Sequence, residues 1–329
     1  MEFKEEHIAF RKIMREFADS EIAPYAREWD RTRTFPLDTV AKMGELGLFG
    51  LPFDERYGGS SSDFTTLCIA IEELARVDQS IAITLEAAVG LGINPIAEFG
   101  TEQQQDRWLP DLVAGRALAG FGLTEPGSGS DASEITTRAE LVDGTWIING
   151  SKAFITNSGT EITSLVTITA KTGPSEISSF IIPTDTPGFE VEPAYDKMGW
   201  HASDTHGLRF EDCRVPEDHL LGTRGHGFRQ FMSILDDGRI AIAALAVGVL
   251  QACLEETTAY AKDRTSFGQS IGSYQAVAFR IADIEVMAEA ARLLTYKAAW
   301  LKDTGQPYRH AAARAKLYAT ESAVSATRM

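Results

Sequence analysis

Residues 119–159 constrain this chain more than any other segment, and they read AGFGLTEPGSGSDASEITTRAELVDGTWIINGSKAFITNSG. A Gly/Ser-rich turn at residues 124–131 is followed by a hairpin pattern and by a second polar cluster at residues 154–157. Both clusters offer hydroxyls, small side chains and backbone N–H groups. These features allow a chain to approach a flat polar ring and a pyrophosphate closely. The segment therefore predicts a site for a ligand that carries both groups.

Composition sets the class of protein around this segment. The 329 residues have a formal net charge of −16, with 44% apolar and 24% charged residues. A chain of this length buries a large core and divides into two or three domains. Its acidity excludes non-specific binding to nucleic acid, so a phosphate ligand needs local cations or N–H groups. Cys68, Cys213 and Cys253 are far apart, which predicts free thiols and no metal site.

The N-terminal residues MEFKEEHIAFRKIMREF are acidic and amphipathic, unlike a signal peptide. No apolar run approaches the roughly 18 residues that a membrane helix needs. We therefore expect a cytoplasmic protein that does not insert into a membrane.

Residues 1–116 show helical spacing, as in Phe10, Ile13, Met14 and Phe17. Further helical runs start near residue 37, cover residues 67–74 and start near residue 101. Residues 117–222 change character, because residues 137–142 alternate in polarity before Asp143-Gly144 and a second run at 145–148. Such a pattern predicts a tight hairpin. Other strands are predicted at residues 165–169, 179–182 and 207–210, which together predict an antiparallel β domain.

The helical pattern returns near residue 227. One long helix is predicted over residues 228–258 and a second after residues 263–268, with an apolar stripe that includes Val277, Ile281, Ile284 and Ala288. A third helix is predicted from about residue 309 and is still running at Met329. Helices, then strands, then helices predict an α+β fold with segregated layers.

The motifs T-E-P-G-x-G-S-D, I-N-G-x-K-x-x-I-T-N and D-R-x-x-F-G resemble those of the acyl-CoA dehydrogenases, and the resemblance covers the whole chain. It implies an N-terminal helical domain at residues 1–116, a middle β domain at 117–222 and a C-terminal helical bundle at 223–329. Members of that family continue for roughly 50 further residues that complete the bundle. We therefore expect the C-terminal bundle to be incomplete in this chain.

The resemblance also implies a reaction, the α,β-dehydrogenation of an acyl-CoA thioester to the 2-enoyl-CoA. A base must remove the proton next to the carbonyl, and a cofactor must accept hydride, because no side chain can do so. The cofactor implied is FAD, and the implied electron acceptor is an electron-transfer flavoprotein. Alternatives are an acyl-CoA oxidase of the same fold and a non-catalytic protein that binds flavin and acyl-CoA.

Eight residues match the family's flavin-contacting positions: Phe121, Leu123, Thr124, Gly129, Ser130, Phe154, Ile155 and Thr156. The resemblance implies that Thr124 and Thr156 hydrogen-bond the flavin edge, and that Gly129 and Ser130 lie by the pyrophosphate. Many relatives carry tryptophan where this chain has Phe154, which keeps an aromatic face.

The D-R-x-x-F-G motif contains Arg264 and Phe267, and Gln275 follows eleven residues after Arg264. In the family, the arginine reaches the FAD pyrophosphate of a neighbouring subunit, a role that suits a planar cation. The glutamine position contacts the adenosine part. These positions imply at least a dimer, and the family is usually a homotetramer.

Substrate positions implied by the resemblance are Ser130, Phe228, Asp236 and Arg239. The family's base is a glutamate, in most members within an E-G-T motif near the C-terminus, and these 329 residues contain no E-G-T. A subset of the family places the glutamate where this chain has Gly238. Asp236 and Asp237 are near, but a carboxylate one or two helical positions away points elsewhere.

We therefore name no catalytic base and expect the 329-residue form to be inactive. Gly238 resembles short-chain and short/branched-chain members.

Overall fold

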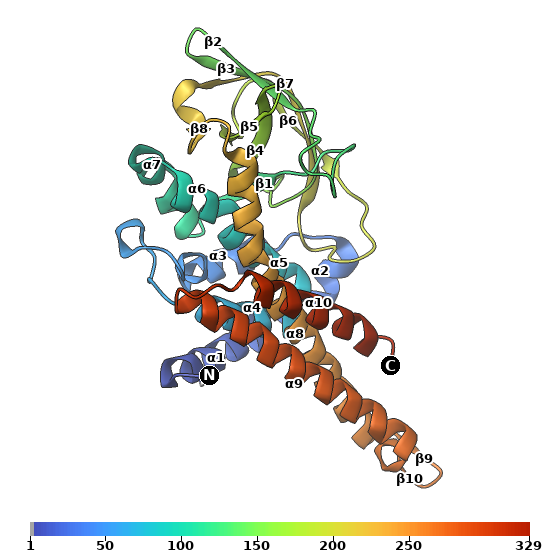
Figure 1. The fold of residues 1–329 in the computed structure, drawn as a ribbon. Coiled ribbons are helices and arrows are strands. Elements are labelled where there is room, and N and C mark those ends of the chain that lie inside the picture. Colours follow the sequence, from blue (N-terminus) through green and yellow to red (C-terminus); the bar gives the residue numbers. More distant parts are fainter. Residues whose placement is uncertain (1–2) are drawn as a thin grey trace. The chain divides into compact units, whose positions relative to one another are not determined.

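The computed structural model describes residues 3–329 (Figure 1). The chain divides into two compact units. Unit 1 combines Met1–Arg27, Ser62–Ile83 and Asp236–Met329, whereas unit 2 combines Glu28–Ser61 and Thr84–Leu235. The predicted α+β fold is confirmed, with helices first, a β-sheet in the middle of the chain and long helices at its end.

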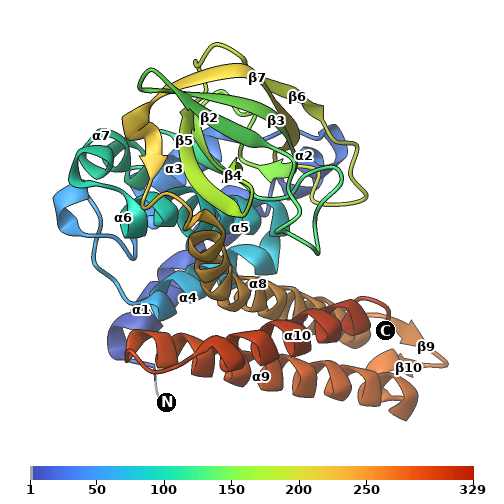
Figure 2. The same cartoon turned by 45° about the horizontal axis from the view of Figure 1, so that its top comes forward.

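Unit 1 is helical. Its elements are α1 (Glu5–Phe17) with the π-helical turn η1 (Ala18–Ile22), α4 (Phe64–Val77), the greater part of α8 (Gly227–Asp263), α9 (Gln275–Asp303) and α10 (Arg309–Ala326). Helices α9 and α10 lie side by side, as Figures 1 and 2 both show. Alanines such as Ala315 and Ala319 are fully buried on α10, and small side chains let helix backbones approach closely. Helix α10 ends at Ala326, slightly before the predicted end, with Thr327 as its C-cap.

Helix α4 is buried on all sides, which the sequence pattern did not predict. Glu72 and Glu73 are each only 1% exposed. The guanidinium of Arg11 donates to Glu73 Oε1 at 2.6 Å, and Arg292 Nε donates to Glu72 Oε1 at 3.0 Å. Buried carboxylates are tolerated only when such partners satisfy them, so these ion pairs allow α4 to run through the centre of unit 1.

Unit 2 begins with helices and ends with a sheet. The helical elements are α2 (Ala26–Thr32, which starts in unit 1), α3 (Leu37–Glu45), α5 (Gln79–Glu86), the π-helical η4 (Ala87–Ile93), α6 (Asn94–Phe99) and α7 (Glu102–Val113). Thr101 and Gln104 form a capping box at the start of α7, where the sequence predicted a helix. Gln104 Nε2 also donates to the carbonyls of Asp218 and Leu220, at 2.7 and 2.9 Å, and so fastens α7 to the chain at β8.

The sheet has eight strands: β1 (Leu118–Gly122), β2 (Arg138–Val142), β3 (Thr145–Thr156), β4 (Thr163–Gly173), β5 (Glu176–Pro183), β6 (Phe189–Ala194), β7 (Thr205–Pro216) and β8 (Leu220–Leu221). The order is β6-β7-β3-β2-β4-β5-β8, and β1 pairs with β4. Asp143 and Gly144 have φ of 49° and 75°, which confirms the tight hairpin between β2 and β3.

The prediction of a purely antiparallel sheet is wrong for two pairings with β4, because β2 pairs parallel with it through Arg138 and Lys171, and β1 does so over its whole length. Strand β1 pairs parallel with β4, with Phe121 opposite Thr167. The β2–β3 hairpin lies between β1 and β4 in the chain, so their connection is a crossover. Turn residues reveal hairpins, but no local pattern marks a crossover, which is why the sequence could not show this pairing.

Two helical segments, Gln79–Phe99 and α8, are long and apolar enough to cross a membrane by length and composition alone. This corrects the sequence expectation that no segment comes close to that length. The most apolar window of Gln79–Phe99 is 78% buried inside the chain's own fold, as in a core helix.

Candidate functional site

A buried ion pair joins the two polar clusters of residues 119–159 in unit 2. Lys152 Nζ lies 2.9 Å from Glu125 Oε1, and both side chains are at most 2% exposed. The other carboxylate oxygen of Glu125 accepts from the Thr136 amide at 2.6 Å and from its hydroxyl at 2.7 Å, while Oε1 also accepts from the Thr137 amide at 3.0 Å. The glutamate of T-E-P-G and the lysine of I-N-G-x-K are therefore partners. Both motifs are visible in the sequence, but neither motif predicts that these two residues pair.

Electrostatics agree with this geometry. Burial opposes ionisation of Glu125, but the Lys152 ammonium and the hydrogen bonds from Thr136 and Thr137 outweigh it and lower the Glu125 pKa to about 2. Burial lowers the pKa of Lys152 to about 8, against the pull of Glu125. The pair is thus charged at neutral pH and holds the loop of residues 124–137 against β3.

The end of β3 is distorted where the second cluster lies. The pairing with β7 slips between Lys152 and Ile155, which marks a β-bulge. Phe154 and Asn157 both have left-handed backbones, with φ of 60° and 57°. Such conformations are unfavourable for residues with a side chain and concentrate at functional sites. They turn Phe154 out of the strand, and its side chain is 66% exposed.

The eight predicted flavin residues separate into two groups. The side chains of Phe121, Leu123 and Ile155 are buried in apolar clusters, and the Phe121 ring stacks on Phe231 with centroids 4.0 Å apart. These three residues can therefore meet a ligand only through backbone atoms or ring edges.

The other five residues retain accessible atoms: Thr124, Gly129, Ser130, Phe154 and Thr156. The amides of Gly129 and Ser130 donate to no acceptor within residues 3–329. A Cβ at Gly129 would meet nothing closer than Thr124 Cγ2 at 3.9 Å, so this backbone is open. Open amides, hydroxyls and an exposed aromatic face fit a ligand that combines a phosphate with a flat ring, as FAD does.

In unit 1, the three residues predicted to contact the FAD of a neighbouring subunit lie on or beside a small hairpin that the sequence pattern did not predict. Strands β9 (Thr265–Ser266) and β10 (Gln269–Ser270) are joined by Phe267 and Gly268, with φ of 51° and 78°. The Phe267 side chain is 94% exposed. Arg264 is exposed just before β9 and forms no ion pair within residues 3–329, and Gln275 is the first residue of α9.

The two aspartates next to Gly238 on α8, in unit 1, already have partners. Asp236 pairs with Arg239 and with Arg309, whose Nε lies 3.2 Å away. Asp237 is 4% exposed and accepts from Lys302 Nζ at 2.9 Å and from the Tyr308 hydroxyl at 2.5 Å. Neither aspartate is therefore a free base in this structure.

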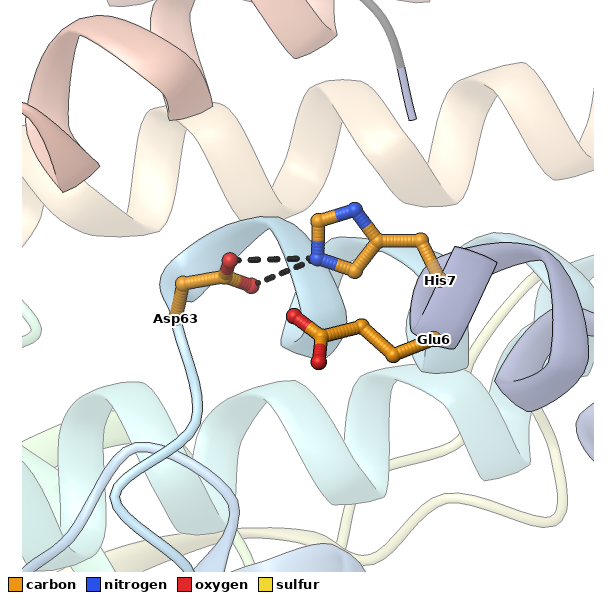
Figure 3. A group of neighbouring side chains, drawn as sticks. All are labelled: Glu6, His7 and Asp63. Atoms are coloured by element: carbon orange, nitrogen blue, oxygen red, sulfur yellow. Dashed lines mark hydrogen bonds and ion pairs between the residues drawn. The ribbon is translucent and has the colours of Figure 1, made fainter. Parts of the chain in front are cut away.

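Figure 3 shows Glu6, His7 and Asp63 of unit 1, whose ligand atoms lie close enough together to hold a metal ion. The His7 ring points at the Asp63 carboxylate, with Nε2 3.1 Å from both oxygens. Lys4 Nζ lies 3.1 Å from Glu6 Oε1 and 3.0 Å from Asp63 Oδ2, and so supplies the positive charge there. Asp63 also caps α4 by accepting from the Thr66 amide, so we assign the cluster a structural role.

Three family descriptions match this chain: the acyl-CoA dehydrogenase N-terminal domain at residues 4–116, the middle domain at 120–213 and the C-terminal domain at 225–329. A Bacillus subtilis protein named "Probable acyl-CoA dehydrogenase YngJ" is 47% identical over 328 residues, which are 99% of this chain and 86% of that protein. A short-chain-specific acyl-CoA dehydrogenase of Clostridium acetobutylicum is 42% identical over 96% of this chain and 84% of its own length. The chain belongs to the acyl-CoA dehydrogenase family.

Solved structures of family members have the same fold as this chain. Butyryl-CoA dehydrogenase from Megasphaera elsdenii superposes with a TM-score of 0.96 at 39% identity, covering all of this chain and 87% of that one. A chain from work on the electron transferring flavoprotein of Acidaminococcus fermentans has a TM-score of 0.97 at 42% identity, with the same coverage. Glutaryl-CoA dehydrogenase from Mycobacterium smegmatis, solved with FADH2, has a TM-score of 0.94 at 29% identity and covers 99% of this chain and 83% of its own. The family is one of flavoprotein oxidoreductases, and FAD is its cofactor.

Proposed function

We propose that this protein is an FAD-dependent acyl-CoA dehydrogenase for a short or branched acyl-CoA thioester, with electrons passing to an electron-transfer flavoprotein. The observation that carries the proposal is the Glu125–Lys152 pair, which, together with the hydrogen bond from the Ala153 amide to the Thr124 carbonyl at 2.9 Å, attaches the first polar cluster to β3 beside the second. Similarity to short-chain-specific relatives supports the substrate class.

Each accessible residue has a role in this proposal. The hydroxyls of Thr124 and Thr156 bond the polar edge of the flavin, and the exposed face of Phe154 covers its ring. The open amides of Gly129 and Ser130 bind the pyrophosphate. Bound FAD supplies the hydride acceptor that no side chain can provide.

The substrate residues proposed are Ser130, Phe228, Asp236 and Arg239. Because Arg239 pairs with Asp236 in this structure, binding the CoA arm requires it to exchange that partner for a phosphate. The carbonyl also needs hydrogen-bond donors where negative charge develops, and a base must accept the α-proton.

One observation favours a second candidate, a protein that binds flavin and acyl-CoA without catalysis. Both aspartates near Gly238 are held in ion pairs, and the 329 residues contain no E-G-T. An acyl-CoA oxidase is the remaining alternative, since the same fold is found in the prolyl acyl carrier protein oxidase AnaB, at 31% identity and a TM-score of 0.93.

Anaerobic addition of a short-chain acyl-CoA to the FAD-loaded protein separates these functions. A dehydrogenase supplied with its base bleaches the flavin and recovers slowly in air, whereas an oxidase recovers quickly. A binding protein perturbs the flavin spectrum and does not bleach it, even when a segment bearing the missing base is supplied. The last outcome would contradict the proposed dehydrogenation.

Replacing Arg264 by alanine tests the proposed contact with the FAD of a neighbouring subunit. We expect FAD to be retained less well while the melting temperature of the apoprotein changes little, because an exposed arginine without an ion pair contributes little to stability. Arg280→Ala, exposed on α9, is the matched control and should leave both unchanged. An Arg264→Ala protein that loses stability but binds FAD normally would contradict this assignment.

A further inference from the structure

A hydrogen-bonded network of polar groups, separate from the Glu125–Lys152 pair, supports the end of β3. None of its residues has a role in the proposed function. Asp204 lies just before β7 and accepts with Oδ2 from the amides of Ser158 and Gly159, at 2.8 and 2.9 Å. Its other oxygen, Oδ1, lies 2.7 Å from His206 Nε2. The Asp204 carboxylate therefore links the histidine ring to the turn that follows Thr156.

Both nitrogens of the His206 ring face acceptors. Nε2 faces the Asp204 carboxylate, and Nδ1 lies 2.6 Å from the carbonyl oxygen of Glu192 on β6. A carbonyl and a carboxylate can only accept, and a neutral imidazole has a single N–H. The ring can make both hydrogen bonds at once only as an imidazolium, so this geometry favours the charged form.

The surroundings of the ring fix this arrangement. The His206 side chain is 12% exposed, and a Cβ on Gly159 would lie 2.4 Å from Nε2, so the turn backbone lies directly on the ring. The other polar groups near the ring are the Glu192 carboxylate and the Tyr195 hydroxyl, which border the neighbouring Gly207, and the Lys197 ammonium. The hydrogen bond to Asp204 is the largest influence on the pKa of His206 and raises it, whereas burial and the Lys197 ammonium lower it by less.

The turn held in this way sets the conformation of the proposed flavin contact. Asn157 is left-handed and fully buried, and its Nδ2 donates to the Thr84 carbonyl at 3.0 Å. Its amide donates to the Asp204 carbonyl at 3.3 Å, directly after Thr156. A shift of the Asp204 loop therefore moves Thr156 as well.

We propose that His206 is a positioning residue that acts through Asp204: its imidazolium holds residues 155–159 in the conformation that presents Thr156 to the flavin, so that FAD retention weakens when the ring loses its proton. This inference rests on the proposed function for the identity of the ligand.

The direction of the pH effect follows from the linkage. A histidine whose pKa is raised by folding contributes its full stabilisation below its unfolded value of about 6.5, and the contribution is lost as the pH rises through the folded pKa. The turn is therefore held firmly in mild acid and loosened above that step.

The test measures the FAD dissociation constant of the full chain from about pH 5.5 to about pH 9, the range in which a histidine titrates. We expect wild-type affinity to weaken roughly threefold to tenfold across the step, the loss expected for one hydrogen bond. His206→Gln should already be weak at low pH and should lack the step, whereas His310→Gln, exposed on α10, should behave as wild type. Asp204→Asn, which keeps an acceptor but removes the charge, should move the step to lower pH.

A measurement on the apoprotein tests the role of His206 separately from the proposed flavin-dependent function. Hydrogen exchange of the Ser158 and Gly159 amides in the apoprotein, corrected for intrinsic rates, should speed up across the step in wild type and not in His206→Gln. If no FAD binds at any pH, the proposed function fails, and the exchange data still decide whether His206 holds the turn. The inference would be overturned if wild type, His206→Gln and Asp204→Asn showed the same pH dependence of amide exchange and the same pH dependence of FAD affinity.

Discussion

Replacing Lys152 by alanine is expected to lower the free energy of unfolding of unit 2 by about 3–5 kcal/mol, the usual effect of removing one partner from a buried ion pair. The reason is local, because the buried Glu125 carboxylate loses its cation and keeps only the donors of Thr136 and Thr137. Urea unfolding followed by tryptophan fluorescence measures the loss, since Trp146 lies in the core of the sheet. FAD retention should fall with it, because the loop of residues 124–137 loses its attachment to β3.

Two further variants show whether the pair itself is responsible. The double variant Glu125→Gln with Lys152→Met removes both charges together and should recover most of the stability, since no unpaired charge stays buried. Arg138→Ala, exposed on β2, should change the free energy of unfolding by less than about 0.5 kcal/mol. A Lys152→Ala protein as stable as Arg138→Ala would contradict the role assigned to the pair.

The second large effect concerns catalysis. We expect the 329-residue chain to bind acyl-CoA without dehydrogenating it, and a version extended by a family-type C-terminal segment with Glu-Gly-Thr to react at least about 10²–10⁴-fold faster, the usual contribution of a general base. Asp236 and Asp237 cannot replace that base, because their oxygens are already bound to Arg239, Arg309, Lys302 and Tyr308. Anaerobic bleaching of the flavin by a short-chain acyl-CoA measures the rate.

The control is the extended chain with glutamine in place of that glutamate, which should again fail to bleach the flavin. Asp237→Asn in the 329-residue chain should alter stability through Lys302 and Tyr308 rather than activity. Rapid turnover by the 329-residue chain, lost in Asp237→Asn, would show that α8 carries the base after all.

The sequence predicted the features that depend on neighbouring residues alone, namely a tight turn, a helix cap and an apolar helix face. Asp143-Gly144 adopts the positive φ values of a tight hairpin, and Thr101 with Gln104 caps the helix predicted from that point. The apolar face of α4 was predicted as well, including Leu67 and Leu74, which are buried.

Features that depend on partners distant in the sequence were not predicted. The burial of Glu72 and Glu73 depends on Arg11 and Arg292, which are distant in the sequence and pair with them only in the folded chain. Glu125 and Lys152 lie in motifs of the candidate site, yet 27 residues separate them and no spacing rule pairs a loop with a bulged strand. The parallel pairing of β1 with β4 is likewise fixed by a crossover that turn residues do not reveal.

The most direct test of the central claim is the amount of FAD that the purified chain holds after reconstitution with excess cofactor, read from its absorbance spectrum and from the mass of the released ligand. We predict one FAD per chain at saturation, with retention reduced when the hydroxyls of Thr124 and Thr156 are removed together in Thr124→Val/Thr156→Val. A folded protein that takes up no FAD at any concentration, or a double variant that binds FAD as tightly as wild type, would contradict the assignment of the flavin site to residues 119–159.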